Sequence, residues 1–159
     1  SIDPAIITYI MRREGKTFDE MDRILNKESG ILGIAGESGD MRDALAAADA
    51  GNERAKLAIE MYVYRVQKAI GSYYAAMTRT DAVVMTAGIG ENSAELRELI
   101  FAGLAHMGMI LDKERNQVEG AIGMNRIISI DDSPIKICVV TADEEIRIAR
   151  ETDSLVSQL

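Results

Sequence analysis

Residues 81–93, Asp81-Ala-Val-Val-Met-Thr-Ala-Gly-Ile-Gly-Glu-Asn-Ser93, are typical of an apolar strand that leads directly into a double-glycine turn and then a helix. Residues 83–85 are apolar, so we expect them to form a buried strand. Gly88 and Gly90 let the backbone turn sharply and approach a ligand closely. An α/β protein builds anion or nucleotide sites in this way, because the positive end of the following helix faces the turn.

The segment after the turn predicts an amphipathic helix. Asn92 with Glu95 is typical of a capping pair at a helix start. The turn lacks the third glycine of the dinucleotide-binding fingerprint and the Gly-Lys-Ser/Thr of a Walker A loop, so neither motif applies. Taken alone, the segment is explained equally well by an ordinary strand-to-helix turn. The apolar side of the predicted helix contains Leu96, Leu99, Ile100, Gly103, Leu104 and Met107.

Composition and charge limit the partners of the chain. Its 159 residues, 47% of them hydrophobic, suffice for one core, or for one core and a helical appendage. The net charge of −8 argues against nucleic acid or an acidic membrane as a partner. The sequence contains no apolar run long enough to span a bilayer and no signal-peptide pattern. The lone Cys138 fits a reducing cytoplasm, and the lone His106 is a poor candidate for catalysis or metal binding.

Residues 1–78 are expected to be mostly helical. A first helix is predicted from Pro4 to Gly15, and Thr17 is expected to begin a second one through a capping box. Residues 29–39 carry glycine at every third position and predict an irregular segment.

The longest predicted helix runs from Asn52 to about Thr78. Its apolar face is broad enough to be buried on more than one side. Such a helix is either the central helix of a domain or half of a subunit interface, and the sequence alone leaves both open.

Residues 79–159 are expected to form an α/β portion. Thr141 with Glu144 predicts a capping box at a point where a strand ends. Together with the glycine turn, this junction would lie at the carboxyl ends of strands, where α/β proteins place their sites. The predicted elements after the glycine turn and its helix are strands at 109–111, 126–130 and 135–140 and a helix at 142–157.

Four separated motifs then occur in the order found in acetate kinases, and the chain resembles that family over all of residues 1–159. The resemblance implies an α/β fold that is part of a ribonuclease-H-like, actin-like ATPase domain, namely the C-terminal part of the family's second domain. The chain does not begin with methionine, and we expect it to belong to a larger protein. The motifs are Asp3-Pro-Ala-Ile-Ile7, Ser38-Gly-Asp-Met-Arg-Asp43, Gly88-Ile-Gly-Glu-Asn-Ser93 and Thr141-Ala-Asp-Glu-Glu-Ile-Arg-Ile-Ala-Arg150.

The resemblance implies an ATP or ADP site. Asp40, Met41 and Arg42 match a family segment that lies against the adenosine. Methionine stands where the family has an aromatic residue, which keeps an apolar surface but removes a stacking ring. The plain alternative for Asp40 and Arg42 is a solvated ion pair or a helix cap.

The family's second nucleotide segment is the turn that holds adenine and ribose. Glu144 matches the acidic residue that helps to place Mg²⁺, or Mn²⁺ in its stead, and its plain alternative is the capping box with Thr141. The residues that match the turn are Gly88, Ile89, Gly90, Glu91 and Asn92.

The resemblance also implies an activity. Acetate kinases transfer the γ-phosphoryl group of ATP to acetate, or form ATP from acetyl phosphate and ADP, as cytoplasmic homodimers. Their phosphate-handling residues lie upstream of the matched segment, so we expect no catalytic residues here and an inactive isolated chain. His106 and Arg97 are not in a context that matches the family's catalytic motifs.

Three alternatives remain open at this point. A propionate or butyrate kinase shares the ATP half of the family, while its acyl pocket lies elsewhere. The chain could also be a nucleotide-binding or dimerisation module without turnover. A sugar kinase or chaperone relative fits less well, because those proteins share the fold but not the Gly-Ile-Gly-Glu-Asn sequence.

Overall fold

The computed structural model describes residues 2–117, 125–142 and 144–157, and the chain consists of two compact units. The first unit is Ser1–Arg65 and the second is Val66–Leu159. The long helix α5, Glu53–Ala76, contains the boundary between them. Within the described ranges, none of the helices has both the length and the apolar character that crossing a membrane would require.

The first two helices confirm the capping predictions. In α1, Pro4–Glu14, the Asp3 carboxylate accepts a hydrogen bond from the Ala5 amide at 2.9 Å, and Gly15 ends the helix in the left-handed region with φ 64°. Helix α2, Phe18–Lys27, begins with the predicted capping box between Thr17 and Glu20. Capping chemistry thus locates these helix starts correctly from sequence.

The glycine-rich segment that was expected to be irregular contains a short helix, α3, Gly30–Ala35. It is stabilised from outside its own sequence, because the Arg54 guanidinium donates from Nε to the Ile34 carbonyl at 2.8 Å, at the end of the helix. Gly36 follows with φ 90° and terminates it. The prediction of irregular backbone over residues 29–39 is therefore wrong for residues 30–35 and correct for residues 36–39.

Helix α4, Met41–Asp49, and the part of α5 up to Arg65 complete the first unit. The predicted long helix is confirmed, and the Asn52 side chain caps it by accepting from the amides of Arg54 and Ala55 at 3.0 and 3.1 Å. The buried apolar side chains of this unit are mostly small and come from α2 to α5. They are Met21, Ala35, Met41, Ala44, Ala55, Ala58 and Ile59.

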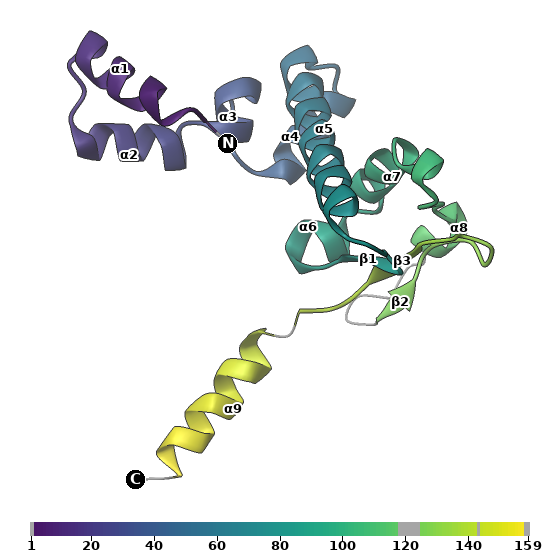
Figure 1. Cartoon of the computed structure of the whole chain (residues 1–159). Coiled ribbons are helices and arrows are strands. Elements are labelled where there is room, and N and C mark those ends of the chain that lie inside the picture. The colour runs from purple at the N-terminus through teal and green to yellow at the C-terminus, as the bar shows by residue number, and fades with distance from the viewer. Residues whose placement is uncertain (1, 118–124, 143, 158–159) are drawn as a thin grey trace. The chain divides into compact units, whose positions relative to one another are not determined.

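The second unit is built on a sheet whose described strands follow the order β1-β3-β2. Strand β1, Ala82–Met85, pairs in parallel with β3, Lys136–Val139, and the register places Met85 beside Val139. Strand β2, Arg126–Ile127, pairs antiparallel with β3. Because β1 and β3 are parallel, their carboxyl ends lie at the same edge of the sheet, where α6, Ala87–Asn92, and α9, Glu144–Val156, follow (Figure 1).

Two strand predictions are corrected. The expected strand 126–130 forms β2 only at residues 126–127. The Ile128 amide still donates to the Ile137 carbonyl of β3 at 2.8 Å, but the chain then turns to a different partner, and the Ile130 amide donates to the Ile110 carbonyl at 3.1 Å. The expected strand 109–111 is reduced to this contact and a single bridge between Leu111 and Ser129. Strand β1 forms where predicted but is not fully buried, since Val84 is 53% exposed.

Helix α7, Ala94–Ala102, supplies much of the core of the second unit. It ends before Met107, the last residue on the apolar side of the predicted helix, because the Gln67 side-chain amide donates to the carbonyls of Leu99 and Ile100 at 3.2 and 3.0 Å. A 3₁₀ turn, η1, Ala105–Met107, follows. The buried apolar side chains are Leu96, Ile100, Phe101, Leu104, Met109, Ile128, Ile135, Ile137 and Val139.

Candidate functional site

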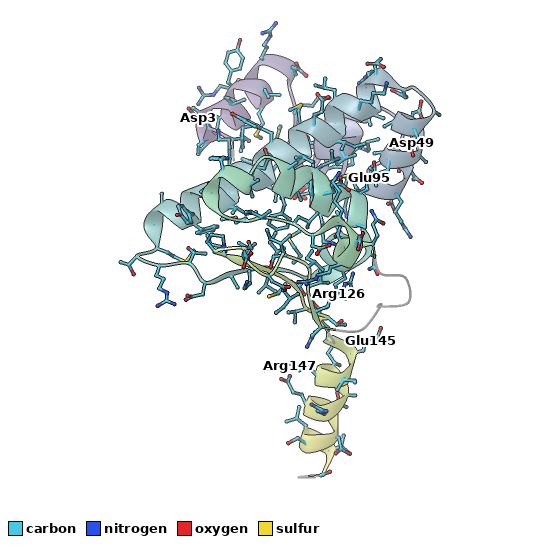
Figure 2. All side chains as sticks on the ribbon, turned by 90° about the vertical axis from the view of Figure 1, so that its right-hand side faces the viewer. Asp3, Asp49, Glu95, Arg126, Glu145 and Arg147 are labelled. Atoms are coloured by element: carbon cyan, nitrogen blue, oxygen red, sulfur yellow. The ribbon has the colours of Figure 1, made fainter. Side chains whose placement is uncertain are left out.

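A cavity of about 410 Å³ lies at the carboxyl ends of β1 and β3. One wall comes from α6, and the other comes from the β3–α9 junction and the first turn of α9. Figure 2 shows Glu145 at the first turn of α9, close to the strands. The lining residues are Ala87, Gly88, Glu91, Thr141, Ala142, Glu144 and Glu145.

The glycine turn is a short helix rather than an open loop. Neither Gly88 nor Gly90 has a positive φ, and the left-handed residue is Ala87, with φ 59°, directly after the strand. Residues 87–92 continue as α6, so Asn92 is inside this helix and does not cap the next one. Its side-chain amide donates to the Gly88 carbonyl at 2.9 Å. Ser93 caps α7 instead, because it has the extended backbone that a cap requires and accepts from the Leu96 amide at 3.3 Å.

The two glycines of α6 have different surroundings. A methyl group added at Gly90 would lie 3.1 Å from the backbone carbonyl carbon of Met85, so this glycine allows α6 to pack tightly on the end of β1. A methyl group at Gly88 would meet nothing within 4 Å. Gly88 lines the cavity, whereas Gly90 allows close packing of α6 against the Met85 backbone and not against a ligand.

The other wall of the cavity is tied to α6 by a hydrogen bond. The Ala142 amide donates to Glu91 Oε1 at 2.9 Å, and the Thr141 amide donates to Asn125 Oδ1 at 3.0 Å. Helix α9 begins at Glu144, two residues later than predicted, so Thr141 is not its cap. The residue that would cap it, 143, lies outside the described residues. Glu91 thus links the two walls of the cavity.

The carboxylates at this cavity suit a divalent cation that arrives with phosphate groups. In the described part of the chain, no three His, Cys, Asp or Glu side chains converge as a metal site would require. Glu144 and Glu145 both line the cavity. Mg²⁺ is commonly held by one or two carboxylates together with substrate phosphates and waters, so this donor set fits a cation shared with a nucleotide.

The remaining predicted site residues lie in the first unit, at the start of α4. Asp40 caps the helix and pairs with Arg42: its Oδ1 accepts from the Arg42 amide at 2.8 Å, and its Oδ2 lies 2.6 Å from Arg42 Nη2. Asp40 and Arg42 therefore form the helix cap and the solvated ion pair that the sequence offered as the alternative to a nucleotide contact. Met41 is 7% exposed, so an adenine contact at this residue stays a prediction that rests on the resemblance.

We expect the Asp40 carboxyl to titrate with a pKa of about 2, mainly because the Arg42 side chain and then the Arg42 amide donate hydrogen bonds to its charged form. Since the folded pKa is below the ordinary 3.8, the stabilisation is present above pH 4 and is lost as the pH falls towards 2. Carbon-detected NMR titration measures this pKa directly. In Arg42→Ala the pKa of Asp40 should return most of the way to the ordinary 3.8, and an unchanged pKa would contradict the pairing of Asp40 with Arg42.

The structure gathers some predicted site residues and leaves others apart. Gly88, Glu91 and Glu144 surround one cavity in the second unit, while Asp40 to Arg42 belong to the first. Glu145 lies in the junction 141–145 that was expected to form part of the site, whereas two other residues were not predicted: Ala87, which lines the cavity, and Arg97, which donates to the carbonyls of Gly90 and Glu91 in its α6 wall. Arg97 interrupts the apolar side of α7 at the position three before Ile100, and a charge in such a stripe is the signal that could have identified it.

The family model described as the Acetokinase family matches residues 1–150. The chain belongs to the acetokinase family. It is 48% identical over 151 residues to an acetate kinase of Bacillus mycoides and 44% identical over 155 residues to one of Methanosarcina acetivorans. These alignments cover 95% and 98% of the chain but 37% of each relative. The chain therefore spans a little over a third of the length of these acetokinase relatives.

Solved structures of family members agree with the fold. A Porphyromonas gingivalis acetate kinase superimposes with a TM-score of 0.85 at 39% identity, over 98% of the chain and 39% of that structure. A Francisella tularensis propionate kinase gives 0.82 at 39% identity, over 95% of the chain and 38% of that structure. The predicted fold class, α/β as part of a ribonuclease-H-like domain, is confirmed by this similarity to acetokinases.

Proposed function

We propose that the chain is the nucleotide-binding C-terminal part of an acetate kinase, which converts ATP and acetate into ADP and acetyl phosphate. The observation that carries the proposal is the cavity at the ends of β1 and β3, where Gly88 faces Glu144. Two segments that the family resemblance assigns to the nucleotide and its metal are separated by some fifty residues of sequence, yet they line one space. Ligands of α/β sheets bind at this edge of the sheet.

In this proposal the chain binds and orients the nucleotide. The Gly88 position leaves room at the α6 wall for the nucleoside, and Glu91 fixes the opposite wall by accepting from the Ala142 amide. Glu144, with Glu145 beside it, would hold Mg²⁺, which when bound neutralises phosphate charge. The family resemblance also assigns Asp40 and Arg42 to a segment that contacts the adenosine. The residues that handle the transferred phosphoryl group would belong to the upstream part of a longer protein, so the isolated chain should not turn over.

A propionate kinase is the second candidate, and one observation favours it. The Francisella tularensis propionate kinase has the same identity to this chain as the Porphyromonas gingivalis acetate kinase and nearly the same TM-score. The nucleotide part of the fold therefore carries little information on acyl length, because the acyl pocket lies elsewhere. A butyrate kinase, and a nucleotide-binding or dimerisation module without turnover, are the remaining alternatives.

A coupled assay of ADP release separates these candidates. The full-length protein, meaning this chain joined to the upstream part that its relatives possess, is assayed with Mg²⁺ and ATP and with acetate, propionate or butyrate. We expect the largest kcat/KM with acetate and background release without an acyl acceptor. The purified 159-residue chain serves as the negative control. A preference for propionate or butyrate would reassign the acceptor, and turnover no faster with any acyl acceptor than without one would refute the proposal.

Replacing Asn92 by alanine should weaken ATP binding more than acetate binding. In the structure the Asn92 side-chain amide donates to the Gly88 carbonyl at 2.9 Å. The family resemblance assigns the same amide to the nucleoside, and one hydrogen bond there would contribute about 0.5–1.5 kcal/mol net. The KM for ATP should therefore rise roughly 2- to 13-fold. Steady-state kinetics with each substrate varied in turn measures both constants. If only the KM for acetate moves, the α6 turn does not serve the nucleotide.

We further propose a cytoplasmic homodimer that uses α5. Large apolar side chains on and just after this helix are exposed in the single chain, including Tyr73 at 68% and Met77 at 50%. Light scattering on the purified chain should give about 35 kDa, twice its mass of 17.4 kDa. A broad mass that rises with concentration would indicate a face normally covered by the rest of a longer protein, and a monomer at high concentration would contradict both.

A further inference from the structure

Arg97 is a buried arginine that binds the backbone of the α6 helix. Its side chain is 1% exposed, and its Nη1 donates to the carbonyls of Gly90 and Glu91, both at 2.9 Å. On its other side, Nε donates to Asn116 Oδ1 at 2.7 Å and Nη2 to the Asn116 carbonyl at 3.0 Å. Asn116 ends the short helix α8, Lys113–Asn116, and is completely buried. The guanidinium therefore joins α8 to the wall of the candidate nucleotide cavity.

Burying the Arg97 guanidinium has a large desolvation free energy, which only hydrogen bonds or ion pairs can offset. A buried cation must be matched by hydrogen bonds, and within the described residues those of Arg97 go to carbonyl and amide oxygens. Burial, and then repulsion from Arg126, lower the pKa of Arg97 to about 10, so the group is still charged at neutral pH. An apolar residue would fill the core at this position without such a cost.

The carbonyls that Arg97 contacts are those that α6 cannot satisfy itself. The last carbonyls of any helix lack partners within the helix, and they form its negative end. Helix α6 has six residues, too few to be stable on its own. Arg97 supplies both hydrogen bonds and positive charge at that end. Asn116 in turn fixes the guanidinium, and its Nδ2 donates to the Ala94 carbonyl at 2.8 Å, at the start of α7.

From α6 the connection continues to the cavity itself. Glu91 makes two hydrogen bonds in this connection. Its backbone carbonyl accepts from Arg97, and its side-chain carboxylate accepts from the Ala142 amide at 2.9 Å. A shift of α6 would thus move both Gly88 on one wall and the segment that leads to Glu144 on the other.

We propose that Arg97 and Asn116 are positioning residues for the nucleotide: they hold α6 so that Gly88 and Glu91 shape the cavity, without touching the ligand. This inference rests on the proposed function. A purely structural pair would lower the stability of the protein when altered and would leave the balance between the two substrates unchanged. A positioning pair must change the handling of ATP selectively.

The test compares Asn116→Ala, Arg97→Lys and the milder Asn116→Asp in the full-length protein, with Arg115→Lys as control. Arg115 lies beside Asn116 on α8 but binds Asp131 and the Ser129 carbonyl, away from α6. We expect the KM for ATP to rise on the order of 10-fold in Asn116→Ala and Arg97→Lys, since outer-shell partners typically affect binding or activity to this degree. The KM for acetate should stay constant. Asn116→Asp keeps an acceptor for Arg97 and should show a smaller rise.

Amide hydrogen exchange provides a readout that needs no turnover. Exchange at residues 88–92 and at Ala142 should accelerate in Asn116→Ala and not in Arg115→Lys. The inference would be overturned by unchanged exchange at these residues, by an unchanged KM for ATP, or by an equal rise of the KM values for ATP and acetate. If Asn116→Ala does not fold, the same criteria are applied to Asn116→Asp and Arg97→Lys. A wild-type protein without acetate-dependent turnover would instead refute the proposed function on which the inference rests.

Discussion

Replacing Glu144 by glutamine in the full-length protein is expected to lower kcat by about 100-fold. The change removes one carboxylate charge from the first turn of α9, at a cavity where Glu144 and Glu145 are the acidic residues proposed to hold Mg²⁺. Phosphoryl transfer depends on neutralising phosphate charge, and a metal ligand contributes several kcal/mol of this, of which about 2.7 kcal/mol corresponds to 100-fold in rate. Steady-state assays over a range of Mg²⁺ concentrations measure the effect.

The helix itself offers a matched control. Glu151 lies further along α9 and pairs with Arg147 at 2.9 Å, outside the cavity, so Glu151→Gln removes the same charge from the same helix without touching the site. It should leave kcat within twofold, as expected of an exposed pair. The concentration of Mg²⁺ at half-maximal rate should rise in Glu144→Gln and stay constant in the control. Equal effects of the two changes would mean that Glu144 acts only through general charge.

Replacing Gly90 by valine is expected to destabilise the protein by roughly 1–3 kcal/mol, the usual effect of overpacking a core. Even the first added carbon would lie 3.1 Å from the Met85 carbonyl carbon, and strand backbone cannot move aside as a flexible side chain can. Helix α6 would have to lift off the end of β1. Chemical denaturation followed by circular dichroism measures the change, and an unaltered free energy of unfolding would show that the tight packing of α6 on β1 is not required.

The neighbouring glycine should behave in the opposite way. Gly88 has open space around it and an ordinary helical backbone, so Gly88→Ala should stabilise the fold by about 0.5–1 kcal/mol. The added methyl group would project into the cavity proposed for the nucleotide, and the KM for ATP should rise. A protein that becomes more stable while binding ATP less well would separate the function of Gly88 from any structural role.

Local sequence rules predicted the elements that local chemistry determines. Asp3, Thr17 and Gly15 place the ends of α1 and α2 through capping contacts between neighbours in sequence. The long periodic face of α5 likewise located that helix almost to its ends. These elements need no knowledge of the rest of the chain, because their start and stop signals lie within them.

The elements that the sequence did not predict depend on distant partners. Helix α3 ends where the Arg54 guanidinium binds the Ile34 carbonyl, twenty residues away in sequence. The chain leaves β3 after Ile128, because the Ile128 carbonyl accepts from the Asp112 amide and the Ile130 amide donates to the Ile110 carbonyl. The pattern of apolar residues within these short segments gives no information on hydrogen-bond partners that are distant in sequence, so their structure could not be predicted from it.

The candidate site shows the same division. The pairing of β1 with β3 brings Gly88 and Glu144 to one edge of the sheet, and this was expected from the order of strands and helices. Arg97 and Asn116 were not expected, because they act through the backbone of α6 and nineteen residues separate them. The roles proposed for the predicted residues come from the resemblance to the acetokinase family, whereas the tertiary contacts of Arg97 and Asn116 come from the structure alone.

A crystal structure of the full-length protein with ADP and Mg²⁺ would show where the nucleotide binds. We expect the nucleotide in the cavity at the ends of β1 and β3, with its nucleoside against Gly88 and its phosphate-bound cation on the side of Glu144. ADP bound elsewhere, with neither Gly88 nor Glu144 in contact with the nucleotide or its cation, would contradict this expectation.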